Sequence, residues 1–118
     1  MDYKFIDTKA VLVINGRQFS LDIGEIEVGE NAEALIAACF DSKVGSTELI
    51  SNVRAALDKL LGAGAADTLL KDISATNEIQ VRRLGLAVGS GVNKKRAEMI
   101  LSAFTSMAQD APEEQRAD

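Results

Sequence analysis

The stretch VLVINGRQFSLDIG, residues 11–24, decides the fold of the N-terminal part of this chain. Its centre is Asn15-Gly16, a pair that favours a two-residue type I′ turn because both central residues of that turn need a positive φ. The turn sets the register of the strands it joins, so that Leu12 pairs with Phe19. The sequence therefore predicts an antiparallel β-hairpin over about residues 8–23.

Side chains alternate across the two strands, so the predicted hairpin has two unlike faces. One face is apolar, and it needs a cover because an isolated hairpin is only marginally stable in water. We expect the helices that follow to supply that cover, and we expect the second face to stay open to a protein partner. The apolar face carries Ala10, Leu12, Ile14, Phe19, Leu21 and Ile23, and the second face carries Val11, Val13, Gln18 and Ser20.

The rest of the chain is predicted to be mainly helical. Residues 47–61 have the clearest pattern, with apolar side chains at helical spacing behind a cap at Ser46 or Thr47. Glycines and short polar stretches divide the remainder, including Gly89-Ser90-Gly91 near the end. The expected helices cover about residues 31–41, 47–61, 65–73, 76–88 and 93–109. The last of them is expected to bury a stripe formed by Ala97, Ile100, Leu101, Phe104 and Ala108.

Two kinds of alternative remain at this stage. Residues 3–6 and 26–28 are each candidates for a third strand beside the hairpin. Composition favours helix over residues 75–90, but Ile79 and Val81 are also typical of the start of a strand. The predicted class is α+β, with a hairpin of two or three strands packed against four or five helices.

Length and charge limit the class of protein further. The chain has 118 residues and a net charge of −5, which suits a single domain over residues 1–109 and a flexible polar tail over residues 110–118. The acidic balance argues against general binding to nucleic acid or to anionic membranes. No apolar run approaches the roughly 18 residues of a membrane span, so we expect a cytoplasmic protein.

Residue types that carry catalysis are scarce. The chain has no histidine, and its single cysteine, Cys39, lies in an apolar run where a buried thiol is expected. The usual catalytic triads and transition-metal sites therefore lack their parts. The sequence also has no phosphate-binding loop and no dinucleotide fingerprint. We expect no enzymatic activity, no catalytic residue, no metal and no cofactor.

One motif has the form of an anion-binding element. GVNKKRAEMIL, residues 91–101, is close to the hairpin of a helix-hairpin-helix module, in which amides at the start of a helix hold a phosphate. The candidate anion-binding residues are Gly91, Asn93, Lys94, Lys95 and Arg96. Alternatively, these side chains reach solvent or pair with nearby acidic residues. We favour this alternative, because the chain is acidic and has few aromatic residues on which bases could stack.

The hairpin is also similar to the start of many small tailed-phage proteins of the tail assembly chaperone type. Those proteins open with an apolar strand, an ING turn and a second strand that ends in a glycine. ISNVRAALDKLLGAGAADTLL, residues 50–70, resembles a segment of small phage proteins in which a helix ends at a glycine-rich break before a short helix. The matching residues there are Leu60, Leu61, Gly62, Gly64, Ala65 and Ala66.

The resemblance implies a non-enzymatic phage or prophage protein in the cytoplasm of a bacterial host. Such proteins act through protein–protein contacts, binding the long helical tape-measure protein until tail tube subunits polymerise around it. The implied partner is a tape-measure-like helical protein. Independently of the resemblance, self-association through the second face of the hairpin is equally allowed. Family members are often extended by translational frameshifting. Two alternatives remain: a small helix-hairpin-helix-like domain associated with nucleic acid, and an accessory structural protein of the virion.

Overall fold

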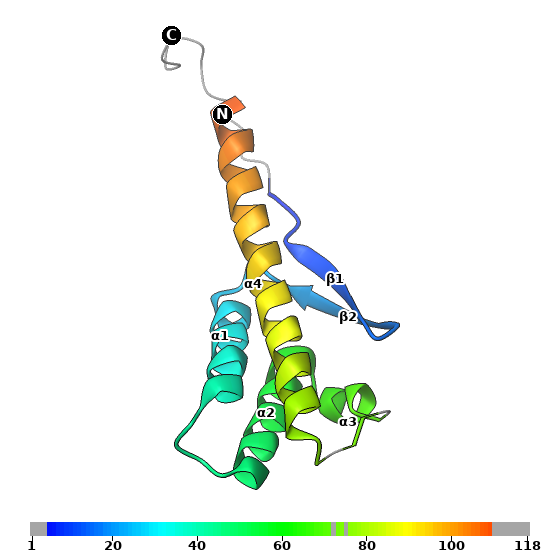
Figure 1. Cartoon of the computed structure of the whole chain (residues 1–118). Coiled ribbons are helices and arrows are strands. Elements are labelled where there is room, and N and C mark those ends of the chain that lie inside the picture. Colours follow the sequence, from blue (N-terminus) through cyan, green and yellow to red (C-terminus); the bar gives the residue numbers. More distant parts are fainter. Residues whose placement is uncertain (1–4, 72, 75, 110–118) are drawn as a thin grey trace.

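The chain folds as an α+β structure organised around one long helix (Figure 1). The computed structural model describes residues 5–71, 73–74 and 76–109, with the side chains described as far as residue 105. The long helix α4 packs against α1 and α2 along its first half, and the hairpin lies on its other side. The elements in chain order are β1 (Lys9–Ile14), β2 (Arg17–Asp22), α1 (Ile26–Phe40), α2 (Ser46–Leu61), α3 (Ala65–Leu69) and α4 (Glu78–Gln109).

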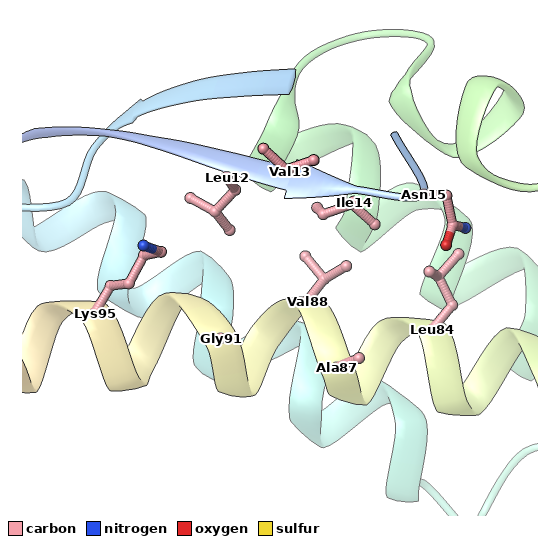
Figure 2. Close-up of a pocket in the computed structure, with 9 residues that line it drawn as sticks. All are labelled: Leu12, Val13, Ile14, Asn15, Leu84, Ala87, Val88, Gly91 and Lys95. Atoms are coloured by element: carbon pink, nitrogen blue, oxygen red, sulfur yellow. The ribbon is translucent and has the colours of Figure 1, made fainter. Parts of the chain in front are cut away.

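The predicted hairpin is confirmed, including its turn and its register. Asn15 and Gly16 have φ values of 50° and 77°, as the type I′ turn requires. Leu12 pairs with Phe19 across the antiparallel ladder. Leu12 and Ile14 point from β1 toward α4 (Figure 2), and Leu12 is buried. The apolar face of the hairpin is therefore covered by helix, as its composition requires.

Among the described residues the sheet has two strands. Residues 26–28 belong to α1, so this candidate for a third strand is wrong. Phe5 and Ile6 are not in a strand, and residues 3–4 lie outside the described part of the chain, as does the expected tail over residues 110–118.

Helix α1 begins at Ile26, five residues before the predicted start at residue 31. The cause is a tight turn built on Asp22, whose carboxylate accepts hydrogen bonds from the Thr8 hydroxyl and from the amide of Gly24. The amide of Glu25 also donates to the backbone carbonyl of Asp22 at 3.2 Å. This turn ends β2 and directs the chain straight into the helix.

Helix α2 matches its prediction to within one residue, with Gly45 rather than Ser46 or Thr47 at the N-cap. Gly62 and Gly64 follow it with φ values of 116° and 86°, which residues with a Cβ rarely adopt. Helix α3 ends at Leu69 instead of residue 73, because the chain turns at Leu70 and buries both leucines.

Helix α4 is continuous across Gly89-Ser90-Gly91, so the predicted pair of helices over 76–88 and 93–109 is wrong. The two glycines on its α1 side let the helices approach closely. A Cβ at Gly85 would lie 2.5 Å from Sγ of Cys39, and one at Gly89 would lie 2.7 Å from Cγ1 of Ile36. Gly89, part of the predicted break, is therefore a packing position inside a helix that its neighbours stabilise.

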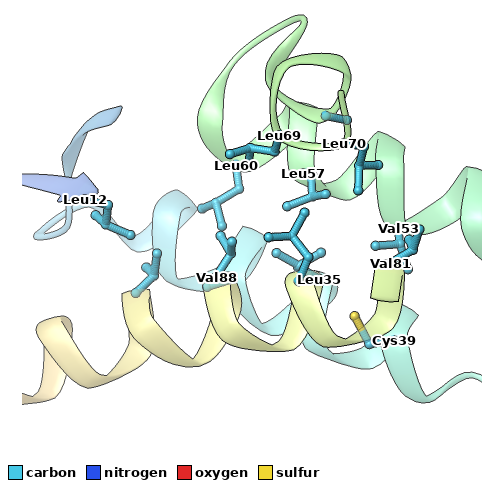
Figure 3. Packing of buried hydrophobic residues seen from close by; sticks show 14 of the residues in the cluster. Leu12, Leu35, Cys39, Val53, Leu57, Leu60, Leu69, Leu70, Val81 and Val88 are labelled. Carbon is cyan, nitrogen blue, oxygen red and sulfur yellow. The ribbon is translucent and has the colours of Figure 1, made fainter. Parts of the chain in front are cut away.

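The core lies where α1, α2 and α4 meet (Figure 3). Leu35 of α1, Val53 and Leu57 of α2 and Val81 of α4 are all fully buried there. Their contact packs the first half of α4 against α1 and α2. The second half of α4 extends beyond this core, as Figure 1 shows, and it is there that the candidate functional surface lies.

Candidate functional site

No group of three or more His, Cys, Asp or Glu among the described residues is placed to hold a metal ion. No helix in the described part of the chain is long and apolar enough to cross a membrane. The candidate sites in the described part of the chain are single reactive groups and exposed surfaces.

Cys39 is a packing residue at the contact between α1 and α4. Its side chain is buried, and its Sγ occupies the space that Gly85 leaves open. Burial raises the pKa of the Cys39 thiol, and the positive charge of Arg82 opposes this more weakly. The reactive thiolate is thus disfavoured. The expectation of a buried thiol is confirmed.

A small polar network joins the first turn of α2 to the first turn of α4. Arg82 donates to Glu78 at 3.0 Å, and the Ser46 hydroxyl donates to the other carboxylate oxygen at 3.1 Å. These two hydrogen bonds hold the pKa of Glu78 below its ordinary value. Arg82 also donates to the carbonyl of Cys39 at 2.6 Å and so connects α1 as well. The network therefore holds the C-terminal end of α1 and the N-terminal ends of α2 and α4 together.

The five candidate anion-binding residues lie inside α4, and the helix start that was expected to present their amides is absent. Amides within a helix donate to the carbonyl four residues earlier, so none is free for a phosphate. Lys94 and Lys95 are exposed, whereas the Arg96 side chain lies over Gly29 of α1. Without free amides the motif is a basic stretch of helix surface, and the expected helix-hairpin-helix form is wrong.

The outer face of the hairpin is open, as its pattern predicts. Val11 and Val13 are more than half exposed, and Gln18 and Ser20 beside them are also exposed. The structure thus leaves a small apolar face with polar neighbours. Its use by a partner stays a prediction.

A larger apolar surface lies on the second half of α4, where the sequence pattern predicts a buried stripe. That prediction is wrong: Ile100, Leu101 and Phe104 are 52%, 68% and 65% exposed, and Ala97 is exposed as well. The side chain of Ala108 lies outside the described residues. We call residues 97–105 of α4 the arm, and its side chains at positions 97, 100, 101 and 104 the arm stripe.

The arm stripe is exposed because the elements packed on α4 end before they reach it. A helix rises about 1.5 Å per residue, so the 32 residues of α4 span about 48 Å and the 15 residues of α1 span about 22 Å. Ile26, the first residue of α1, is next to the stripe and is itself 71% exposed. The surface is therefore built by one helix and the tip of another.

A recess of about 350 Å³ lies between α1 and α4 at the base of the arm. Ile26 and Gly29 line it from α1, and Ala97 and Ile100 line it from α4, with Glu30, Glu33, Asn93 and Arg96 around them. Two of the lining residues, Gly29 and Ala97, have little or no side chain. The recess is open to solvent and joins the arm stripe directly.

A second groove of similar volume separates β1 from α4 (Figure 2). Leu12 and Ile14 line it from above, and Leu84 and Val88 line it from below, with Lys95 at one end. The space exists because α4 has Ala87 and Gly91 beneath the strand, and a Cβ at Gly91 would meet nothing within 4 Å. The groove separates the hairpin from α4 and brings no cluster of polar groups together.

Comparisons with protein-family models, curated proteins and solved structures find no match to this chain.

Proposed function

We propose that this chain is a non-enzymatic phage or prophage protein that acts in the bacterial cytoplasm through protein–protein contacts. Its role is that of an assembly helper of the tail chaperone type, which holds a helical segment of a partner protein. The observation that carries the proposal is the arm stripe, an apolar surface on a helix that projects beyond its own core.

The spacing of the arm stripe suits a helical partner. Positions 97, 100, 101 and 104 fall within a sector about 100° wide on a helix of 3.6 residues per turn. Apolar anchors at i, i+3, i+4 and i+7 are the pattern by which amphipathic helices and their receptors engage. Large apolar patches with polar surroundings mark interaction sites more often than they persist bare in water.

The surroundings of the stripe favour a specific contact over indiscriminate adhesion. Lys94 and Glu98 are exposed on one flank, and Glu30 and Glu33 form the rim of the recess on the other. A polar rim around an apolar centre is the usual composition of a protein interface. The similarity of the hairpin to tail assembly chaperones supplies the kind of partner, a long helical tape-measure-like protein.

Co-expression with a fragment of a candidate tape-measure protein tests this function. We expect the wild-type chain to keep the fragment soluble and to co-purify with it. Leu101→Lys puts a charge in the centre of the stripe and should abolish co-purification. Ser102→Lys is the matched control, because Ser102 is exposed on the opposite side of the same helical turn.

Unfolding curves of both lysine variants should match that of the wild type, because the arm lies beyond the buried core. If the wild-type chain neither solubilises nor binds the fragment, the proposed function is refuted. If both lysine variants bind as well as the wild type, the arm is the wrong surface, and the outer face of the hairpin becomes the one to vary.

A further inference from the structure

We infer that, in the free protein, the arm stripe pairs with the arm stripe of a second copy of this chain, the two helices running antiparallel. Phe104 of each copy lies against Ala97 of the other, at the recess beside Ile26. This inference rests on the proposed function, which uses the same arm stripe. The second copy covers the stripe until a partner helix binds there.

The order of large and small residues along the stripe is self-complementary in one direction only. In an antiparallel pair centred between residues 100 and 101, Ile100 of one copy faces Leu101 of the other, and Phe104 faces Ala97. In a parallel pair Phe104 would face Phe104, and Ala97 would face Ala97, which leaves a gap at one end. A symmetric dimer requires such a self-complementary patch, in which residue i contacts j and j contacts i.

The recess provides room for the aromatic ring. It has a volume of about 350 Å³ and lies beside Ala97, with Gly29 at the α1 wall under the Arg96 side chain. An aromatic side chain that enters a concave site is the kind of anchor that dominates interface energetics. Because the pair is symmetric, each dimer has two such anchors.

The area is sufficient for a weak, specific dimer. From their exposed fractions, Ile26, Ile100, Leu101 and Phe104 present about 500 Å² per copy, so pairing removes on the order of 1,000 Å² from solvent, the lower end of specific interfaces. An interface of that size is typical of weak, transient complexes. Such a dimer would cover the apolar arm and yet release it to a competing helix.

Sedimentation equilibrium over a concentration series of the full chain tests the inference. We expect the wild type to show a monomer–dimer equilibrium and Phe104→Ala to weaken it at least tenfold. Ala97→Leu is the decisive variant, because it makes the stripe more apolar and yet blocks the place of Phe104. It should also weaken the dimer at least tenfold. The swap Ala97→Phe with Phe104→Ala should restore most of the affinity, and Ser102→Leu should leave it unchanged.

Several results would overturn the inference. One is a wild-type chain that stays monomeric at millimolar concentration; if that chain still binds a helical partner through Leu101, the proposed function stands alone. Another is a dimer that Ala97→Leu leaves intact or strengthens, which would show that the two stripes meet in another register. A dimer abolished by Val11→Lys would place the interface on the hairpin instead. Circular dichroism of each variant checks that the fold is kept.

Discussion

The close approach of α1 to α4 depends on glycines inside α4, and it predicts different changes in stability for two chemically identical substitutions. Gly85→Ala and Gly91→Ala both place a methyl group inside the same helix. A Cβ at Gly85 would lie 2.5 Å from Sγ of Cys39, 3.1 Å from Cγ1 of Val53 and 3.3 Å from Cδ1 of Leu35. A Cβ at Gly91 would meet no atom within 4 Å.

The magnitudes follow from two terms. Replacing glycine by alanine within a helix stabilises it by roughly 1 kcal/mol, and both variants gain this amount. Extra volume in a packed core costs about 1–3 kcal/mol, and only the variant at Gly85 bears this cost. We therefore expect Gly91→Ala to raise the free energy of unfolding by about 1 kcal/mol. Gly85→Ala should fall about 1–3 kcal/mol below Gly91→Ala, since the difference between them isolates the packing cost.

Urea unfolding followed by far-ultraviolet circular dichroism measures both values. The protein concentration must be held fixed and low, because any self-association stabilises the folded state by mass action. Cys39→Ala provides the internal check, since it removes the sulfur atom that the new methyl group meets. In that background Gly85→Ala should lose most of its penalty, which a double-mutant cycle reports directly.

Two outcomes would refute this reasoning. If Gly85→Ala were as stable as Gly91→Ala, the helices would not approach as closely as described. If Gly91→Ala instead lowered the free energy of unfolding by about 1 kcal/mol or more, the helix would be broken at residues 89–91.

Further predictions concern the turn, the core, a carboxylate and the hairpin surface. Gly16→Ala should lower the free energy of unfolding by about 1 kcal/mol in urea titrations, because Gly16 has a φ of 77°. Leu57→Ala should lower it by about 2–5 kcal/mol by the same measurement, because Leu57 is fully buried. The pKa of Glu78 is lowered in the folded state, so its contribution to stability is present above the ordinary value of 4.5 and is lost as the pH falls through the folded-state value; Glu78→Gln should flatten the pH dependence of the melting temperature there. Val11→Lys should leave the melting temperature and the binding of a partner at the arm nearly unchanged, because Val11 is 52% exposed on the outer hairpin face; a large drop in melting temperature would show that this face is core.

The parts of the fold that the sequence predicts correctly are those in which a local rule is decisive. Asn15-Gly16 permits one turn, and that turn places Leu12 opposite Phe19 and both on the covered face. Helix α2 is predicted for a similar reason, since its apolar positions repeat at helical spacing between a cap and Gly62. In both segments neighbouring residues along the chain contain the information.

The errors at the start of α1 and in the middle of α4 share another cause. Glycine can mark the end of a helix, but it can also allow a neighbouring element to pack closely inside one. Gly29 lies before the predicted start of a helix and Gly89 lies in a predicted break, because glycine is unfavourable inside helices. Each instead lies inside a helix, where a side chain of another element fills the space: Arg96 at Gly29 and Ile36 at Gly89. No local rule distinguishes the two meanings, because the atoms that decide are about 40–70 residues away in sequence or on another helix.

The arm stripe was likewise predicted in part by the sequence and decided in part by the tertiary structure. The apolar pattern of residues 97–104 predicts a helix stripe correctly, but it carries no information about whether anything covers that stripe. A continuous α4 extends well past α1 and α2, and the stripe is exposed as a result. A sequence signal was present, since a helix read through residues 89–91 would have been twice as long as any helix available to cover it.

The sequence by itself thus determined the hairpin, its register, its covered face and the absence of histidine chemistry, because turn preference and side-chain alternation act between near neighbours. Tertiary structure alone decided that α4 is one helix, that Gly85 and Gly89 let α1 pack closely against it, and that the apolar residues of the arm face solvent. The physical reason is that burial is a property of two surfaces in contact, and a single chain segment specifies only one of them.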